Sequence, residues 1–246
     1  MIRGTKALVT GASRGIGFKI AEMLIKNGCK VVLCGRNAET LKKATDVLGE
    51  NAFPLVWDVE DINIAEEKVN EAAKIMGGLD IVINNAGVFP ETSEWDKDSL
   101  LKITPFEWQK VMNINASAVF FIMQASVKYM RENNVKGNIL NVTSVAGYET
   151  VRGAYGASKI TATALTKGWG SMYADEGITI NGIAPGPVAT EMNNWHEGDS
   201  MSHSRVPCGR FLKTDEVKKL AEYLLSEDAV MACGETVILD GAYHIR

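Results

Sequence analysis

The sequence contains few of the residues that build metal centres, disulfide frameworks or membrane spans. Its 246 residues include three histidines and four cysteines, and the absence of C-x-x-C spacing argues against a zinc site or a disulfide framework. No hydrophobic run has membrane-spanning length, and the first apolar run is too short for a secretory signal. With a formal net charge of −4, the chain has no basic field to attract nucleic acid. We therefore expect a reduced, cytoplasmic protein without a metal, nucleic-acid or membrane partner.

Short β-branched runs alternate with longer amphipathic stretches along the chain, and no linker or internal repeat divides them. Several runs are apolar almost throughout, as in strands that helices cover on both faces. Seven runs are interpreted as strands: residues 7–10, 30–34, 53–58, 79–84, 138–142, 178–185 and 236–240. The segments between them are long enough for helical crossovers. The pattern predicts a single α/β domain over residues 1–246, with a doubly wound parallel sheet.

The stretch "LVTGASRGIG" places Gly11, Gly15 and Gly17 between the first strand and a helix on which Ile16 and Ile20 recur at helical spacing. Glycines there permit a tight turn and let a dinucleotide pyrophosphate approach the N–H groups of the helix N-terminus. The spacing G-x-x-x-G-x-G differs from the commoner G-x-G-x-x-G. Taken alone, the turn is also compatible with a strand-to-helix connection that binds nothing.

Further motifs follow in order along nearly the whole chain. They are "TGASRGIG", "NNAG" at 84–87, "YGASK" at 155–159 and "PGPVAT" at 185–190. With these motifs the chain resembles the short-chain dehydrogenases/reductases. The "GASRGIG" turn and the ending "GRFLKTDEVKKLAEYLLSEDA…GETVILDGAY" are most similar to the 3-oxoacyl-[acyl-carrier-protein] reductase-like members. The resemblance implies a Rossmann-type fold of about seven strands.

The second site is built around Tyr155 and Lys159, which are four residues apart and share one face of a helix. A nearby ammonium stabilises phenolate, so we expect Lys159 to lower the pKa of Tyr155. Ser144 follows the fifth strand and can hydrogen-bond a carbonyl or alcohol oxygen. Singly, the tyrosine and lysine are also compatible with a packed ring and a solvated charge.

The resemblance implies catalytic roles for Ser144, Tyr155 and Lys159, and it adds a contact from Lys159 to the nicotinamide ribose. Its fourth catalytic member is an asparagine that holds a water in the proton relay. The segment "VMNINASAVFF" offers Asn115, which the family pattern selects, and Asn113 as the fallback. A helix asparagine that bonds only to local backbone is the alternative.

The resemblance also implies a cofactor site distributed over several strand ends. Asp58 and Val59 are expected at the adenine and Asn85 at the adenosine ribose, while the segment 185–190 frames the nicotinamide and Thr190 opens a substrate lid at 190–209. The expected cofactor residues are Gly11, Ser13, Arg14, Gly15, Ile16, Gly17, Arg36, Asp58, Val59, Asn85, Gly87, Tyr155, Lys159, Pro185, Gly186, Val188 and Thr190.

The choice of cofactor depends on the end of the second strand, "VVLCGRN". A member that binds NAD is expected to carry Asp or Glu there, which accepts hydrogen bonds from the ribose hydroxyls. Gly35 occupies that position and Arg36 follows, so the charge that repels a 2′-phosphate is replaced by one that attracts it. Arg14 is close enough in the family pattern to reach the same phosphate. The sequence therefore predicts NADP(H).

The residues predict an oxidoreductase that interconverts a ketone and a secondary alcohol by hydride transfer. A 3-oxoacyl thioester is the first candidate substrate, and a polyol, sugar or hydroxysteroid is the alternative. A nucleotide-binding regulatory protein that has lost the reaction is the non-enzymatic alternative. The helix over about 104–131, which "TPFE" starts with a capping box, and the helix from Tyr155 carry apolar residues on more than one face. The resemblance implies that they pair in a homodimer or homotetramer.

Three features depart from the family pattern. The connection "VAGYETVRGA" between Ser144 and Tyr155 is shorter than usual, which alters one wall of the substrate pocket. The segment after Gly87 is longer and adds Phe89 and Trp95 near the expected entrance, where both could equally be packing residues. Ala242 stands where a second glycine is common, and we expect it to affect subunit packing more than chemistry.

Overall fold

The fold is organised around one sheet of seven parallel strands, as the sequence predicts. The computed structural model describes residues 1–245. The strands lie in the order β3-β2-β1-β4-β5-β6-β7, and every neighbouring pair is parallel. Their bounds are β1 Lys6–Thr10, β2 Lys30–Gly35, β3 Ala52–Val56, β4 Ile81–Asn84, β5 Asn138–Val142, β6 Thr179–Pro185 and β7 Thr236–Leu239. The third strand ends at Val56, two residues before the predicted boundary.

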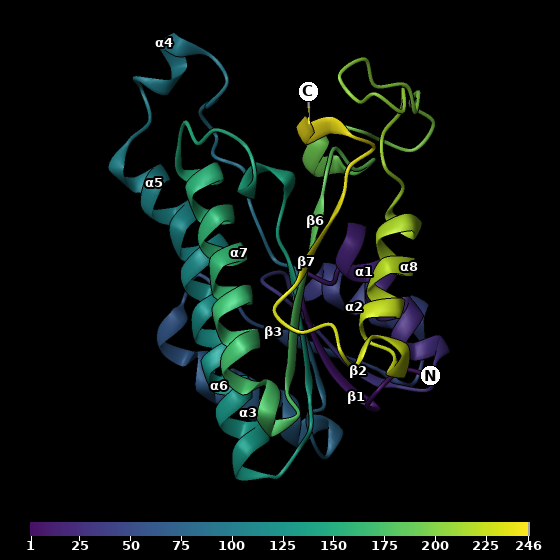
Figure 1. Cartoon of the computed structure of the whole chain (residues 1–246). Helices are drawn as coiled ribbons and strands as arrows, with labels where there is room; N and C mark the ends of the chain where they lie inside the picture. Colours follow the sequence, from purple (N-terminus) through teal and green to yellow (C-terminus); the bar gives the residue numbers. More distant parts are fainter. Residues whose placement is uncertain (246) are drawn as a thin grey trace.

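Helices cover both faces of the sheet, which Figure 1 shows nearly edge-on. On one face lie α1, α2 and α8, and on the other lie α3, α6 and α7, while α4 and α5 belong to the segment between β4 and α6. The helices are α1 Gly15–Lys26, α2 Ala38–Leu48, α3 Ala65–Met76, α4 Lys97–Leu100, α5 Pro105–Met112, α6 Ala118–Glu132, α7 Ala154–Tyr173 and α8 Thr214–Leu224. This is the single doubly wound α/β domain that the strand pattern predicts.

Two apolar cores lie on opposite sides of the sheet because successive strand residues point to opposite faces. Leu8 and Val82 join the core beneath α3 and α6, and the adjacent Val9 and Ile83 join the core beneath α1 and α8. All four side chains are fully buried. Burial on both faces explains why these strands read as continuous apolar runs in the sequence rather than as alternating ones.

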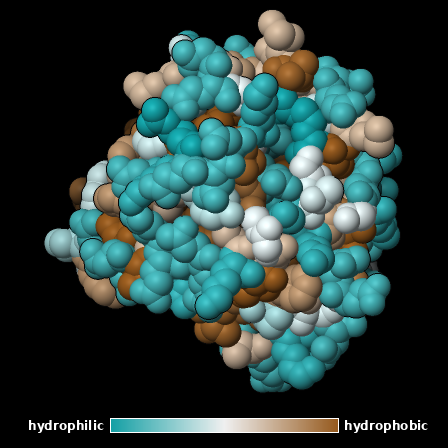
Figure 2. All heavy atoms as spheres, turned by 90° about the horizontal axis from the view of Figure 1, so that it is seen from below, coloured by the Kyte–Doolittle hydropathy of each residue, from teal (hydrophilic) through white to brown (hydrophobic). Residues whose placement is uncertain are grey.

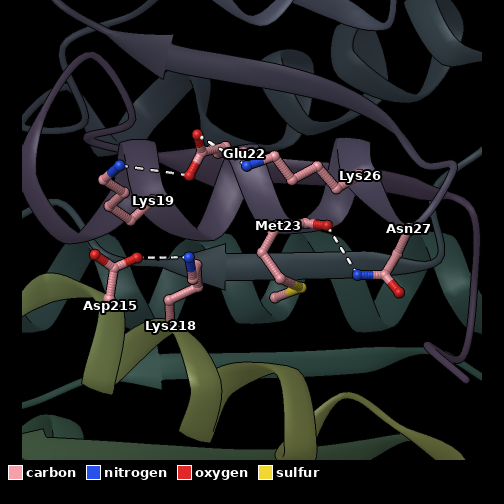
Figure 3. Close-up of polar contacts among 7 residues, drawn as sticks. All are labelled: Lys19, Glu22, Met23, Lys26, Asn27, Asp215 and Lys218. Atoms are coloured by element: carbon pink, nitrogen blue, oxygen red, sulfur yellow. Dashed lines mark hydrogen bonds and ion pairs between the residues drawn. The ribbon is translucent and has the colours of Figure 1, made fainter.

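Charged side chains of α1 and α8 pair within their own helices (Figure 3). Glu22 pairs with Lys19 at 3.4 Å and with Lys26 at 3.2 Å. Lys218 pairs with Asp215 in α8. Helix pairs at this spacing contribute only about 0.3–0.5 kcal/mol each, so these helices are held to the sheet by their apolar faces.

The helix predicted over 104–131 begins with the expected capping box but is not continuous. The Thr104 side chain accepts from the backbone N–H of Glu107, whose carboxylate accepts from the backbone of Thr104. A π-helical turn, η2 (Asn113–Ser117), then separates α5 from α6. The wider turn changes the direction of the side chains within it, and such turns are frequent at functional sites.

The end of the molecule opposite the carboxyl ends of the strands is mainly hydrophilic, and its hydrophobic residues form small separate groups (Figure 2). Scattered exposed apolar residues of this kind are normal on a protein surface. No helix within residues 1–245 is long and apolar enough to cross a membrane.

The C-terminal turn η7 (Tyr243–Ile245) depends on the buried carboxylate of Asp240. It accepts from the backbone N–H groups of Ala242 at 2.9 Å and His244 at 2.8 Å, and it contacts His244 Nδ1 at 2.6 Å. The turn requires a positive φ of 69° at Ala242. Only glycine adopts that conformation without a steric penalty from Cβ. The departure from the usual glycine therefore introduces local backbone strain.

We predict that Ala242→Gly stabilises the protein. Relief of the Cβ penalty is partly offset by the greater freedom of glycine in the unfolded chain, so the free energy of unfolding rises by about 0.5–1 kcal/mol. Urea denaturation measures this as a higher midpoint with an unchanged slope. Ala38→Gly, in the first turn of α2, is the control and lowers stability because its φ is already helical. An unchanged or lower midpoint for Ala242→Gly would show that the turn carries no such strain.

Candidate active site

The sequence-predicted residues gather at one edge of the sheet because all seven strands are parallel. Their carboxyl ends therefore point the same way, toward the top of Figure 1. Crevices beyond this edge are the usual ligand sites of open α/β sheets. The glycine-rich turn follows β1, Asn85 and Gly87 follow β4, Ser144 follows β5, and Gly186 follows β6.

The glycine-rich turn is shaped by close backbone approaches. Gly11 has a positive φ of 62°, and a Cβ on it would lie 2.9 Å from Ala86 Cα. A Cβ on Gly17 would lie 2.6 Å from the carbonyl oxygen of Gly11. Substitution at either position would force the backbone of the turn to move, which is the physical reason for two of the motif's glycines.

Asn85 stabilises this turn directly. Its side-chain Nδ2 donates to the carbonyl oxygens of Thr10 at 2.9 Å and Gly11 at 3.1 Å, while its backbone N–H donates to Thr10 Oγ1 at 3.0 Å. The side chain is thus engaged with protein backbone, and the expected contact with the adenosine ribose stays a prediction. Asn84, its neighbour, is buried and donates to Asn141 Oδ1 across the sheet at 2.8 Å.

The N-terminus of α1 is open to an anion. Arg14 occupies the N-cap position without a side-chain cap, and the first turn contains no acidic residue. The Arg14 guanidinium instead forms an ion pair with Glu191 in η5 (Glu191–Asn193), and both side chains are largely exposed. A Cβ on Gly15 would lie 3.7 Å from Thr190 Cγ2. The start of the expected lid segment therefore borders the glycine-rich turn.

Ser144, Tyr155 and Lys159 lie together between β5 and α7. The Ser144 hydroxyl lies close enough to the Tyr155 side chain to lower its pKa. Lys159 Nζ lies 5.7 Å from the centroid of the Tyr155 ring and donates to the carbonyl oxygen of Val142 at 3.3 Å. Tyr155 and Lys159 are 7% and 5% exposed. The serine hydroxyl, the phenol and the amine thus converge, as their sequence spacing predicts.

Burial dominates the titration of this group. It raises the pKa of Tyr155 to about 12, partly opposed by the hydrogen bond from Ser144, while the charge of Glu94 raises it further. Burial also lowers the pKa of Lys159 to about 8. The net shift of the Tyr155 pKa is therefore upward because desolvation of the phenolate dominates, and the lowering expected from Lys159 stays a prediction.

Asn115 is held in the π-helical turn by the backbone of Val88. Its Oδ1 accepts from Val88 N–H at 2.9 Å, and its Nδ2 donates to Val88 O at 2.9 Å. A Cβ on Gly87 would lie 3.3 Å from Asn115 Oδ1 and 3.5 Å from Lys159 Nζ, so both side chains border Gly87. The fallback Asn113 instead accepts from Gln109 near the surface, which places only Asn115 beside the tyrosine–lysine group.

The other expected cofactor residues vary in burial. Arg36 is exposed directly after β2 and forms no ion pair with any residue in 1–245. Asp58 is exposed beyond β3, whereas Val59 is buried in the core beneath α3. Of the remaining members of the predicted set, Ser13 lies in the turn after β1 and Ile16 in the first turn of α1. Pro185 ends β6, and Gly186 and Val188 lie in the turn after it.

Two residues in the longer segment after Gly87 reach the site. The Phe89 ring packs against Tyr155 with ring centroids 4.3 Å apart. Glu94 is 5% exposed, and its two carboxylate oxygens accept from the backbone N–H of Tyr155 at 3.1 and 3.2 Å. Sequence reasoning placed Phe89 near the entrance. It missed Glu94 because Glu94 belongs to no motif and to no periodic pattern of apolar residues.

Comparison with known proteins identifies the family. Residues 5–199 match the family model described as short chain dehydrogenase. The chain belongs to the short-chain dehydrogenase/reductase family. As a short-chain dehydrogenase/reductase it is an oxidoreductase that uses a nicotinamide cofactor and acts on CH–OH or C=O groups. The resemblance drawn from its motifs is confirmed.

Short-chain dehydrogenases/reductases of several kinds are similar to this chain. Gluconate 5-dehydrogenase from Gluconobacter oxydans is 35% identical, with 99% of this chain and 96% of the relative covered. The 3-oxoacyl-[acyl-carrier-protein] reductase of Vibrio cholerae is 31% identical, with 99% of each covered. A crystal structure of actinorhodin polyketide ketoreductase with NADPH is 29% identical, with a TM-score of 0.87 and 100% of both chains covered.

Proposed function

We propose that this protein is an NADP(H)-dependent enzyme that interconverts a ketone and a secondary alcohol. The observation that carries the proposal is the convergence of the Ser144 hydroxyl, the Tyr155 phenol and the buried amine of Lys159. A protein that only binds nucleotide needs no proton-transfer group beside the cofactor crevice. The convergence of all three groups therefore favours catalysis over a purely regulatory role.

The residues at the carboxyl edge fit a dinucleotide. The N-terminus of α1 has neither a side-chain cap nor an acidic residue in its first turn, so its N–H groups can hold the pyrophosphate. Lys159 lies where it can reach the nicotinamide ribose, and the segment 185–190 can frame the nicotinamide. When bound, the nicotinamide would supply the hydride for ketone reduction or accept it in the reverse direction.

Each catalytic side chain has a role that follows from its position. The Ser144 hydroxyl orients the substrate carbonyl oxygen by a hydrogen bond. The Tyr155 hydroxyl gives its proton to that oxygen during reduction and takes one from the alcohol during oxidation. The charge of Lys159 stabilises the phenolate that forms on Tyr155. Lys159 and Asn115 together form the path along which a proton returns to Tyr155.

We predict that Tyr155→Phe removes turnover and leaves nucleotide binding nearly unchanged. Loss of the proton-transferring hydroxyl lowers kcat by at least about 100-fold, while the phenyl ring keeps the packing against Phe89. Reduced-nicotinamide absorbance measures turnover, and calorimetric titration measures nucleotide affinity. Tyr173→Phe, near the far end of the same helix, is the control and keeps full activity. Retained activity in Tyr155→Phe would refute the proposed mechanism.

The proposed preference for NADP(H) rests on the end of β2. Gly35 provides no carboxylate at that point, and Arg36 is exposed without an ion pair inside 1–245. Its guanidinium is therefore free to bind a 2′-phosphate. Arg14 lies in the glycine-rich turn, and the family pattern places it within reach of the same phosphate. Its exposed ion pair with Glu191 is weak enough to be exchanged for a phosphate.

We predict a lower KM for NADPH than for NADH, and we predict that Arg36→Asp narrows or reverses this difference. The aspartate repels the 2′-phosphate and can accept hydrogen bonds from the ribose hydroxyls of NADH. Steady-state kinetics with both cofactors measure the ratio. Lys43→Asp, an exposed charge reversal on α2, is the control for general electrostatics. A native preference for NADH, or an unchanged ratio in Arg36→Asp, would contradict the proposal.

For the substrate, we propose a 3-oxoacyl thioester as the first candidate. This follows the similarity to the Vibrio cholerae reductase and the resemblance of the C-terminal segment to that subgroup. A sugar acid or polyol is the second candidate, favoured by the 35% identity to gluconate 5-dehydrogenase. Arg152, which borders a small cavity with Trp95 and Glu149, offers a cation for the carboxylate of a sugar acid.

A panel of 3-oxoacyl thioesters, 5-ketogluconate, other sugars and ketosteroids distinguishes these candidates by kcat/KM. We expect the thioesters to be reduced most efficiently. Efficient reduction of 5-ketogluconate, lost in Arg152→Ala, would instead support the sugar-acid assignment. Lys97→Ala, an exposed cation in the segment after Gly87, is the control for loss of a positive charge.

We further propose that the enzyme is a cytoplasmic homodimer or homotetramer in which residues 190–209 act as a substrate lid. Large apolar side chains are exposed on α5 and α7, namely Phe106, Trp108, Ile160 and Met172. Their exposure supports pairing of these helices between subunits. The position of Thr190 and Glu191 beside the glycine-rich turn supports a lid that moves when the cofactor binds.

A further inference from the structure

The catalytic helix α7 begins without a cap of its own. Gly153 is the N-cap residue and has no side chain with which to accept hydrogen bonds from the first turn. Glu94, some sixty residues earlier in the chain, supplies the acceptor instead, with Oε1 3.1 Å and Oε2 3.2 Å from the backbone nitrogen of Tyr155. A carboxylate at this end of a helix is also favoured by the helix dipole.

The carboxylate of Glu94 is buried and therefore needs hydrogen-bond partners that stabilise its charge. It is 5% exposed, whereas Trp95 beside it in sequence is 58% exposed. A buried carboxylate is costly unless its oxygens accept hydrogen bonds. The N-terminus of α7 meets that requirement, so the helix end and the carboxylate stabilise one another.

Gly153 makes room for this carboxylate. A Cβ on Gly153 would collide with the Glu94 carboxyl group and lie 2.8 Å from its Cγ. The φ of Gly153 is −150°, which is extended backbone open to any residue. Space for Glu94, rather than backbone conformation, therefore explains a glycine at the start of the catalytic helix.

The surrounding segments hold this arrangement in place. The Arg152 guanidinium lies 5.8 Å from the centroid of the Trp95 ring, and Phe89 packs on the Tyr155 ring. The longer segment after Gly87 thus contacts the short connection before α7 through Trp95 and the helix itself through Phe89. The longer segment and the shorter connection, which both depart from the family pattern, therefore pack against each other.

The charged and polar groups that face Tyr155 come from three elements. Glu94 contacts its backbone, Lys159 lies one turn further along α7, and the Ser144 hydroxyl lies near its side chain. The negative charge of Glu94 opposes formation of the phenolate, and its effect on the pKa of Tyr155 is upward. Ser144 lowers the pKa of Tyr155.

We propose that Glu94 is a positioning residue that fixes Tyr155 at the start of α7 and keeps its hydroxyl protonated as the proton donor for ketone reduction. This inference rests on the proposed function of Tyr155. Glu94 contacts neither substrate nor cofactor in this role, because its carboxylate is occupied by the helix end. It acts through the tyrosine and extends to higher pH the range in which the hydroxyl can donate a proton.

Glu94→Gln tests the electrostatic part. The amide oxygen can still accept from the Tyr155 N–H, but the charge is lost, so the phenolate becomes easier to form. We expect the high-pH limb of ketone reduction to move down by roughly 0.5–1 pH unit, while the KM for NADPH changes less than about twofold, as expected of a residue remote from the cofactor.

The matched control is Glu91→Gln in the same segment, whose exposed carboxylate pairs with Lys110 at 3.2 Å. It removes the same charge and leaves the pH profile unchanged. An unshifted profile in a folded Glu94→Gln protein, or an equal shift in Glu91→Gln, overturns the proposal. A purely structural role for Glu94 would lower activity without moving the profile.

Gly153→Ala tests whether the position of the Glu94 carboxylate matters, without changing any charge. It also keeps the proposal testable if Glu94→Gln does not fold. The added methyl group displaces the Glu94 carboxylate, so kcat falls several-fold and the pH profile shifts in the same direction. In the double variant the two shifts do not add, because both act through one contact. Additive shifts, or an unshifted profile in Gly153→Ala, would overturn the proposal.

A direct titration separates this inference from the proposed function. Phenolate absorbance is followed against pH, and the curve of the matching Tyr155→Phe protein is subtracted, for both wild type and Glu94→Gln. We expect the Tyr155 transition to move to lower pH in Glu94→Gln, with or without a known substrate. A shift in proteins that reduce no ketone would overturn only the proposed function, whereas no shift would overturn the role of Glu94.

Discussion

Parallel pairing of all seven strands is the constraint on which the site depends. Because each strand must be followed by a crossover to the opposite edge, every strand leaves the sheet at the same edge, and every following turn begins there. The glycine-rich turn and Ser144 are separated by more than a hundred residues, yet both start from this edge. Hydrogen bonds from Asn85 to Thr10 and Gly11 then tie the turn after β4 to the turn after β1.

Desolvation shapes the chemistry of the group at that edge. Burial makes both charged forms costly, so Tyr155 stays protonated and the amine of Lys159 becomes easier to deprotonate. A neutral phenol beside the Ser144 hydroxyl is suited to donate a proton to a carbonyl oxygen as the ketone is reduced. A bound dinucleotide brings negative phosphates and polar groups to the crevice, and the electrostatic environment of Lys159 will change with it.

The segment after Gly87 connects two parts of the site that the family motifs leave separate. At its beginning, the backbone N–H and carbonyl oxygen of Val88 both form hydrogen bonds with the Asn115 amide in the π-helical turn. Further along, Glu94 caps α7 and Phe89 covers the Tyr155 ring. The positions of Asn115 and Tyr155 are therefore coupled through one stretch of chain that carries no family motif.

The sequence by itself determined the sheet, the order of its elements and the location of the main motifs. Buried parallel strands need continuous apolar runs, tight turns need glycine, and a helix places Tyr155 and Lys159 on one face; these are local requirements that one sequence reveals. Only the tertiary structure decided the π-helical turn at Asn115, the strained φ of Ala242, the raised pKa of Tyr155 and the cap from Glu94. Each of these depends on burial or on contacts between segments distant in sequence, and neither periodicity nor spacing records which groups are desolvated or which backbone N–H a distant carboxylate reaches.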